Sequence, residues 1–306
     1  MFFFGFVGLL SGLLWGLNDV LTNVLANHFI LSSIQLMLLF AAFLAFLQDA
    51  LSAFSIIGFY TLCSNWRLQW REMAPARRII FTSAVCAGPL GLLCSILAIN
   101  EIGAVYAGAI TAAYPLVTLV GSSLYLRESL SKWRVLGVIM GVVAVVAIGF
   151  QGEAMTAEPS HFLGFVFAFI SLFGWGMESV FFSAAHKRTN VNSSAILALR
   201  QLFSSACYLL ILLFVFMSSR HGFHLIDAVM SHPGLVVWCI VSACLSYLTY
   251  YFCIKVLSAS TATLFNVSFI FWSAILSVVI GLVILSWWFW LWACLLFMGI
   301  VIAMKN

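Results

Sequence analysis

The sequence predicts an all-α polytopic membrane protein with ten transmembrane helices arranged as two inverted five-helix repeats. Of its 306 residues, 64% are hydrophobic and only 7% are charged, and the mean hydropathy is +1.16. Soluble domains carry about 25% charged residues. Apolar segments close to the roughly 20 residues of a membrane-crossing helix recur along the whole chain. Features of the first half also return in the second half. These three observations set the fold class.

The apolar segments are separated by short polar connections, and none shows the alternating pattern of a transmembrane barrel strand. Each is therefore expected to form one membrane-crossing helix. In chain order, the predicted spans are 2–26, 31–61, 79–98, 103–126, 133–150, 162–185, 193–217, 233–254, 259–283 and 285–304.

The first five spans carry distinct local signals. The first lacks the basic start and the cleavage site of a signal peptide, so it is predicted to remain in the membrane. The second is too long for one simple crossing and is expected to tilt or to extend beyond the bilayer. Pro89 should break the third span, and Pro115 should kink the fourth and free a carbonyl. Two glycines four residues apart favour close packing of the fifth.

The second five spans hold most of the polar residues that are expected within the membrane. The sixth combines Trp175 with the carboxylate of Glu178, and the seventh carries Arg200. The eighth contains three tyrosines, and the ninth contains Asn266. The tenth begins with several tryptophans, which are typical of the membrane–water interface.

The distribution of Lys and Arg predicts that both termini are cytoplasmic. With ten spans, eleven of the thirteen basic residues fall on the cytoplasmic side. Arg220 falls on the outer side, and Arg200 lies within a span. Positive side chains concentrate in cytoplasmic loops. This bias therefore supports the orientation and also the count of ten.

An internal repeat predicts the symmetry of the fold. Trp15 with its following glycine aligns with Trp175 and its glycine, and residues 103–117 align with residues 258–272. Each half has an odd number of spans, so the second half enters the membrane from the opposite side. Such inverted repeats with a site near the bilayer midplane are a transporter design. The predicted repeats are residues 1–150 and 161–306.

Four ionisable residues within predicted spans are candidates for function: Asp19, Asp49, Glu178 and Arg200. A charge in the bilayer interior costs at least about 2.5 kcal/mol on insertion scales, so each needs a partner, a cavity or a neutral form. We expect Glu178 to face a ligand and Arg200 to pair with a carboxylate. The sequence leaves open whether protons are coupled to transport and through which of the carboxylates.

Aromatic side chains on five predicted helices suggest a cavity lined by rings. On each helix an aromatic side chain shares one face with polar or further aromatic residues spaced by three or four positions. Ring faces attract a quaternary ammonium by about 0.5–2 kcal/mol each. Tyrosines also pack between helices, so the role of the tyrosine cluster stays open. The predicted substrate-binding residues are Trp15, Tyr114, Trp175, Glu178, Tyr247, Tyr250, Tyr251, Asn266 and Trp272.

Other classes of function find little support. The eight cysteines and six histidines lack metal-ligand spacing, and no nucleotide-binding or hydrolase motif occurs. The sequence therefore predicts no metal, no cofactor and no enzymatic activity. The net charge of +4 lies in loops, so it indicates membrane orientation rather than nucleic-acid binding.

Six stretches carry a resemblance to a known family: AGPLG (87–91), AAYP (112–115), GWGMES (174–179), RQ (200–201), SYLTYY (246–251) and FNVSFIFW (265–272). The chain resembles the drug/metabolite transporter superfamily, whose members carry two EamA-type repeats. Within that superfamily it is similar to the LicB-like choline transporters of bacteria.

This resemblance implies choline uptake across the bacterial inner membrane, driven by the proton gradient or the membrane potential. It implies that the predicted aromatic residues, with Tyr250 or Tyr251 among them, hold the substrate and that Glu178 is the counter-charge. Phe269 stands where the family resemblance leads us to expect an aromatic hydroxyl. The sequence leaves two other functions open: an exporter of amino acids or aromatic metabolites, and a receptor-like or scaffold protein without flux. It also leaves open whether the protein forms a homodimer.

Overall fold

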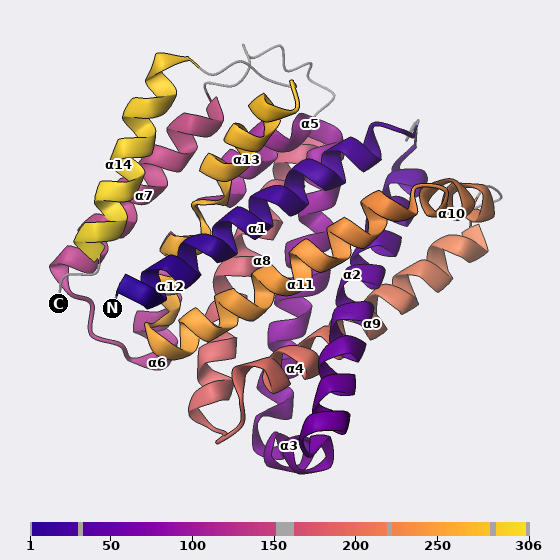
Figure 1. The fold of residues 1–306 in the computed structure, drawn as a ribbon, viewed down its shortest axis with the longest axis horizontal. Coiled ribbons are helices and arrows are strands. Elements are labelled where there is room, and N and C mark those ends of the chain that lie inside the picture. Colours follow the sequence, from indigo (N-terminus) through magenta and orange to yellow (C-terminus); the bar gives the residue numbers. More distant parts are fainter. Residues whose placement is uncertain (1, 30–32, 151–161, 219–221, 282–285, 304–306) are drawn as a thin grey trace.

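The protein is a bundle of packed helices (Figure 1). The structure, a computed structural model, describes residues 2–29, 33–150, 162–218, 222–281 and 286–303. Every regular element in these ranges is a helix. The expected boundary between the repeats at 151–160, together with Arg220 and Lys305, lies outside the described residues.

The first half of the chain forms one helix of 30 residues and several shorter ones. Ser33 caps the long helix α2 by accepting a hydrogen bond from the Leu36 amide at 3.3 Å. The elements are α1 (Phe2–Ala26), α2 (Ile34–Cys63), α3 (Trp66–Glu72), η1 (Ala74–Ala76), α4 (Arg77–Val85), the π-helix η2 (Cys86–Leu93), α5 (Cys94–Thr111), α6 (Tyr114–Leu126) and α7 (Lys132–Phe150).

The second half contains three long helices, a helix interrupted in its middle, and a final apolar helix. Ser258 caps α12 by accepting a hydrogen bond from the Thr261 amide at 3.2 Å. The elements are α8 (Phe162–Lys187), α9 (Ser193–Ser218), α10 (Gly222–Met230), α11 (Pro233–Val256), α12 (Ala259–Asn266), α13 (Phe269–Val279) and α14 (Trp287–Ala303).

The prediction of an all-helical, polytopic membrane protein is confirmed. Within the described residues, seven helical segments are long and apolar enough to cross a membrane: Gly5–Ala26, Ile34–Cys63, Ala74–Ile102, Phe162–Lys187, Ser193–Phe216, Pro233–Val256 and Ala259–Val279. Tyr114–Leu126 and Trp287–Ala303 are shorter apolar helices. The count of ten spans and the cytoplasmic termini stay predictions.

Two predicted helix boundaries in the first half are wrong. The backbone remains helical from Arg77 to Thr111, with no break between residues 98 and 103. It breaks at Ala112, because the ring of Pro115 conflicts with the carbonyl four residues earlier. Pro89 does not break its helix, since the wider turns of η2 accommodate the proline ring.

The predicted ninth span is also divided into two helices. α12 ends at Asn266, and α13 begins at Phe269. The two stretches that align in the sequence, 103–117 and 258–272, therefore interrupt their helices at the same aligned position.

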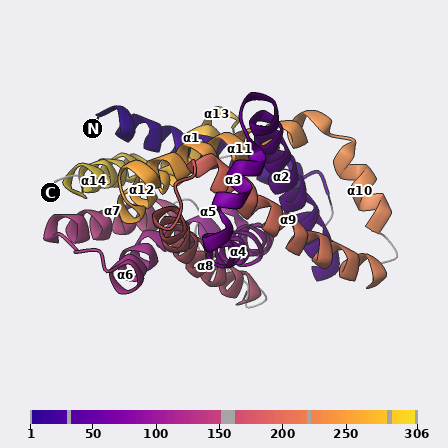
Figure 2. The same ribbon diagram turned by 90° about the horizontal axis from the view of Figure 1, so that it is seen from below.

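The helices pair reciprocally between the two halves. α1 packs on α11, α12 and α13, while α8 packs on α4, η2, α5 and α6. α2 pairs with α9, and α7 pairs with α14. The last two pairs lie toward opposite ends of the molecule (Figure 2). The first helix of each half thus packs against the middle helices of the other half, as expected of halves related by a two-fold axis.

Glycines allow the closest of these helix contacts. A Cβ added at Gly16 of α1 would lie 2.7 Å from the Phe269 carbonyl oxygen and 2.8 Å from the Ser273 nitrogen of α13. A Cβ at Gly176 of α8 would lie 2.5 Å from the Val117 Cβ of α6. Small residues let membrane helices approach to such distances.

We expect Gly16→Ala to lower the free energy of unfolding by about 1–3 kcal/mol, because the added methyl group meets backbone atoms that cannot rotate away. Gly58→Ala is the matched control, since a Cβ at Gly58 meets nothing within 4 Å. It should be neutral or slightly stabilising. Thermal unfolding in detergent compares the two variants. Equal melting temperatures would contradict the tight contact.

Candidate functional site

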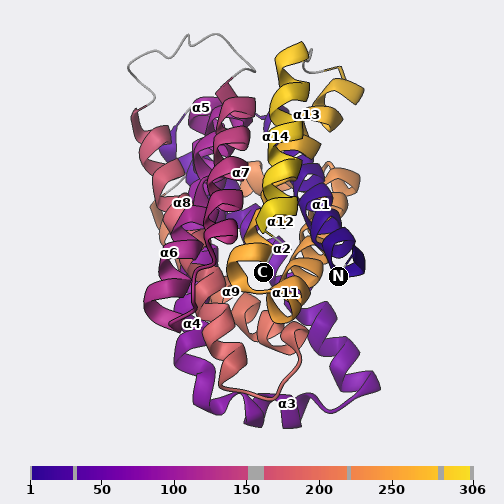
Figure 3. The same ribbon diagram turned by 90° about the vertical axis from the view of Figure 1, so that its left-hand side faces the viewer.

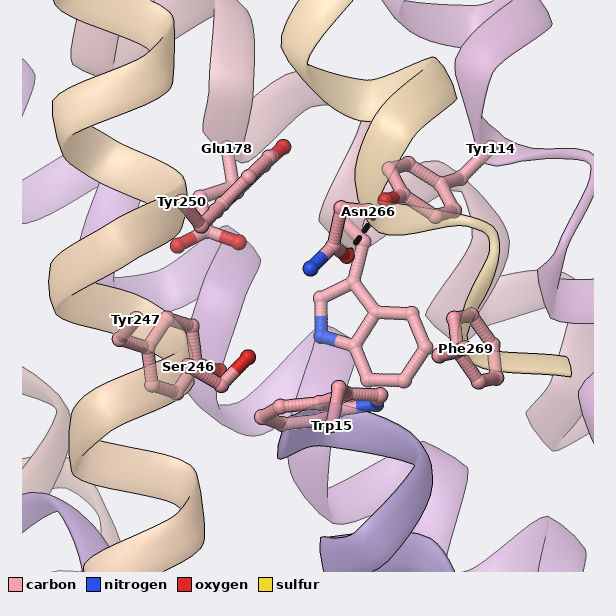
Figure 4. Close-up of a pocket in the computed structure, with 9 residues that line it drawn as sticks. Trp15, Tyr114, Glu178, Ser246, Tyr247, Tyr250, Asn266 and Phe269 are labelled. Atoms are coloured by element: carbon pink, nitrogen blue, oxygen red, sulfur yellow. Dashed lines mark hydrogen bonds between the residues drawn. The ribbon is translucent and has the colours of Figure 1, made fainter. Parts of the chain in front are cut away.

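A pocket lies in the middle of the bundle, where α1, α6, α8 and α11 meet the interruption between α12 and α13. About 340 Å³ of empty space, part of it open to the outside, lies between its side chains. Figure 4 shows the side chains converging from these helices. The pocket is lined by Trp15, Tyr114, Trp175, Glu178, Ser246, Tyr247, Tyr250, Asn266 and Phe269.

The aromatic rings of the pocket meet edge to face. The ring centroids of Trp15 and Trp175 are 5.6 Å apart with an interplanar angle of 89°. Trp15 meets Tyr247 at 5.2 Å and 70°, and Tyr114 meets Trp175 at 6.2 Å and 72°. Edge-to-face pairs are favourable ring geometries. Because neighbouring planes are nearly perpendicular, the rings present faces in several directions.

The two helix interruptions meet at the pocket. Tyr114 begins α6, and Asn266 ends α12. The Tyr114 hydroxyl donates a hydrogen bond of 2.7 Å to the Asn266 Oδ1 (Figure 4). The Asn266 amide nitrogen in turn donates to the Ser11 Oγ at 2.6 Å. Asn266 is thus fixed in orientation by partners on both of its polar atoms.

Other polar groups of the pocket also have partners within the protein. The hydroxyls of Tyr250 and Ser179 share a hydrogen bond of 2.6 Å. The Ser246 Oγ donates to the Ser11 carbonyl oxygen at 2.9 Å. The Tyr247 hydroxyl has no hydrogen-bond partner among the described residues. The main surfaces offered to a ligand are therefore ring faces, this hydroxyl and the Glu178 carboxylate.

A buried ion cluster lies directly behind the pocket. The Arg200 Nη2 is 2.9 Å from the Glu178 Oε1, and the Arg200 Nη1 is 3.1 Å from the Asp49 Oδ1. The relative exposures of Arg200, Asp49 and Glu178 are 0%, 1% and 2%. The guanidinium carbon also lies 4.4 Å from the centroid of the Tyr247 ring. Arg200 therefore links the two carboxylates to the aromatic wall.

The charges of this cluster do not balance. One guanidinium faces two carboxylates, so the fully ionised cluster carries one excess negative charge. An unpaired charge costs several kcal/mol when it is buried. The cluster therefore favours either a nearby cation or a proton.

One oxygen of Glu178 receives the hydrogen bonds. Oε1 accepts from Arg200 Nε at 3.3 Å, from Arg200 Nη2 and from the Tyr251 hydroxyl. Oε2 accepts no hydrogen bond from the residues that the structure describes. The carboxylate is thus held by one oxygen and has the other left for a ligand.

The structure brings together most, but not all, of the predicted site residues. Trp15, Tyr114, Trp175, Glu178, Tyr247, Tyr250 and Asn266 line the pocket. Tyr251 lies behind it, on Glu178 and Arg200. Asp49 and Arg200 belong to the ion cluster.

Trp272 and Asp19 lie away from the pocket lining. Trp272 packs against Phe271 at 5.0 Å between ring centroids, on the side of α13 that faces Gly16 of α1. Asp19 is half-buried on α1. Its neighbour Asn18 turns to α11 and donates to the Cys239 carbonyl oxygen at 2.7 Å.

Ser246 and Phe269 were not among the predicted substrate-binding residues. Ser246 lies one turn before Tyr250, so the spacing of four residues could have placed it on the same face. Phe269 lies next to the helix interruption, and its place in the pocket depends on that interruption.

Comparison with known proteins finds a family similar to the first part of the chain. Residues 3–150 match the EamA-like transporter family. This part of the chain is similar to that family. The match covers the part of the molecule that contributes Trp15 and Tyr114 to the pocket and Asp49 to the ion cluster.

Two further comparisons cover the chain beyond residue 150. Protein LicB of Haemophilus influenzae is 24% identical over 271 residues, which cover 87% of this chain and 85% of that protein. The resemblance to LicB-like members of the EamA superfamily is therefore confirmed. A protein of known crystal structure also matches, with 17% sequence identity and a TM-score of 0.70. The match covers 99% of this chain and 98% of that protein's chain. The second likeness shows that this chain shares the fold of that protein.

We expect Arg200→Gln to lower the free energy of unfolding by about 3–5 kcal/mol, because it leaves two carboxylates buried without a counter-charge. Asp49→Asn combined with Arg200→Gln should cost less than the sum of the single changes, since the pair is removed together. Thermal unfolding of the two single variants and the double variant measures this coupling. Additive losses would show that Asp49 and Arg200 do not interact.

Proposed function

We propose that the protein imports choline, or a closely related quaternary amine, by alternating access. The observation that carries this proposal is a central pocket of aromatic rings beside a carboxylate, with its other polar groups largely engaged by the protein. A quaternary ammonium donates no N–H hydrogen bond and therefore suits a wall of ring faces. Its charge suits Glu178.

The size of the ring contribution is sufficient for selective binding. Trp15, Trp175, Tyr247 and Tyr250 come from three helices and surround one space. Each ring attracts an ammonium by about 0.5–2 kcal/mol, and desolvated sites lie at the upper end. Several such rings together supply micromolar binding when the carboxylate adds to them.

The excess negative charge of the ion cluster supplies the second argument. A cation bound beside Glu178 neutralises the one charge that Arg200 leaves unbalanced. Binding of the substrate then removes the free-energy cost of the unpaired buried charge in the empty protein. A neutral substrate would leave this cost in place.

The alternative of an amino-acid exporter is less well supported. An amino acid brings a carboxylate, for which Arg200 would be the natural partner. Arg200 is fully buried and already donates to Asp49, Glu178 and Tyr251. It is therefore not available to a substrate.

For the transport step, we propose that residues 1–150 and 161–306 are inverted repeats, and that two sets of helices, each drawn from both repeats, rock around the pocket. Tight glycine contacts join α1 to α13 and α8 to α6, so each set moves together. Trp15 belongs to the first set and Trp175 to the second, and the pocket lies between them. Motion of one set against the other alternates access to the two sides of the membrane.

The direct test is uptake of radiolabelled choline into liposomes that contain the purified protein. We expect saturable uptake that unlabelled choline inhibits and that ethanolamine, a primary amine, inhibits less well. Saturable binding without counterflow would instead indicate a receptor-like protein and would overturn the transport proposal.

Substitutions in the pocket should lower affinity. Trp175→Ala removes one ring and should weaken choline binding about three- to thirtyfold. Glu178→Gln keeps the shape and removes the charge, so it should weaken binding as well. Trp288→Ala is the matched control, because Trp288 is exposed outside the pocket and should leave binding unchanged. Unaltered affinity of the Glu178 variant would show that Glu178 is not the counter-charge.

The membrane potential should drive accumulation. An inside-negative potential favours inward movement of one positive charge by about 2.3 kcal/mol per 100 mV. We expect initial uptake to rise with an imposed potassium-diffusion potential. A response to a pH gradient as well would reveal proton coupling. Uptake that ignores the potential would point to an electroneutral exchange of choline for a proton.

A further inference from the structure

The short helix α3 lies across one end of the bundle and links α2 to α4. It runs across the ends of the long helices and not along them (Figure 3). Asn65 caps it by accepting a hydrogen bond from the Leu68 amide at 3.1 Å. α3 is therefore an ordered helix between two membrane segments, and the pocket and the ion cluster make no use of it.

The exposed side chains of α2 show at which depth α3 lies. Phe54, Phe59 and Leu62 are 62%, 63% and 87% exposed. Large apolar side chains that face outward on a membrane helix contact lipid chains. Three residues lie between Leu62, near the end of α2, and Trp66, the first residue of α3. α3 thus begins where contact with the hydrocarbon ends, which is the level of the lipid headgroups.

The aromatic residues of α3 fit that level. Trp66 and Trp70 have ring centroids 6.4 Å apart, and tryptophan is enriched at the membrane–water interface. Arg77, at the start of α4, donates a hydrogen bond of 2.8 Å to the Trp70 carbonyl oxygen. Its guanidinium carbon also lies 4.5 Å from the centroid of a Trp70 ring. Arg77 thereby fixes α3 against α4.

Three further arginines add positive charge on α3 and at the start of α4. Arg67, Arg71 and Arg78 are exposed, and the structure pairs none of them with a carboxylate within its described ranges. Arg67 and Arg71 are one helical turn apart and therefore lie on the same face of α3. Glu72 is the one acidic residue between 66 and 78. Guanidinium groups bind phosphate through paired N–H donors.

We propose that Arg67, Arg71 and Arg78 form a binding site for the headgroup of an anionic phospholipid. The headgroup phosphate lies among the three guanidinium groups, and the acyl chains run along the exposed apolar side of α2. Trp66 and Trp70 hold α3 at the interface, so the arginines do not need to be ordered by the lipid. Polybasic segments beside membrane helices attract anionic lipid in this way.

The test is native mass spectrometry of the purified protein with phosphatidylglycerol or phosphatidylcholine. We expect retained phosphatidylglycerol, little retained phosphatidylcholine, and weaker retention as salt rises. The variant Arg67→Gln/Arg71→Gln/Arg78→Gln should bind phosphatidylglycerol about a hundredfold more weakly. The variant Arg127→Gln/Lys132→Gln/Arg188→Gln removes three exposed charges elsewhere and should bind it as the unaltered protein does.

Three results would overturn the proposal. The first is equal retention of the two lipids. The second is an equal loss in both triple variants, which would show an effect of net charge rather than a site. The third is displacement of phosphatidylglycerol by millimolar inorganic phosphate, which would make the site one for soluble anions. Unchanged thermal unfolding of both variants verifies that each is folded.

Discussion

The ion cluster of Asp49, Arg200 and Glu178 constrains the rest of the structure. Each of these ions costs several kcal/mol to bury and is tolerated only with well-placed partners. Asp49 comes from α2, Glu178 from α8 and Arg200 from α9. The three helices must therefore meet in one arrangement, which ties the first half of the chain to the second. Tyr251 of α11 adds a fourth helix through its bond to Glu178.

The same constraint shapes the pocket. Because Arg200 holds Glu178 by Oε1 from behind, the carboxylate is fixed in place without any ligand. The tryptophans in front of it are held by packing, since Gly91 has no side chain and a Cβ there would lie 2.5 Å from Trp175. The site is thus organised before a substrate arrives, which reduces the entropy that binding must overcome.

The sequence predicts most of the helices because their apolar length is set by the bilayer. It also identifies most of the residues that line the pocket, because charged and aromatic residues are conspicuous in such segments. The sequence predicts less well how each helix is rotated about its axis and where a helix breaks. Tyr250 and Tyr251 are adjacent, so they point about 100° apart on a helix, and only packing decides that Tyr250 lines the pocket while Tyr251 bonds the ion cluster.

Residues beyond a helix break are harder still to place. On a continuous helix Trp272 would lie about 120° around the axis from Asn266, and the interruption at Val267 and Ser268 changes this relation. No proline marks this second break. Asp19 lies one turn after Trp15, about 6 Å further along the axis of α1. At this distance it lies outside the pocket lining.

The hydrogen bond between Tyr114 and Asn266 connects the two interrupted helices across the pocket. A motion that separates α6 from α12 must break it. One such bond contributes a net of about 0.5–1.5 kcal/mol, which changes the ratio of two conformations by roughly two- to thirteenfold. The bond therefore weakly favours the conformation in which α6 and α12 lie together. It is weak enough for a bound cation to change the ratio of the two conformations.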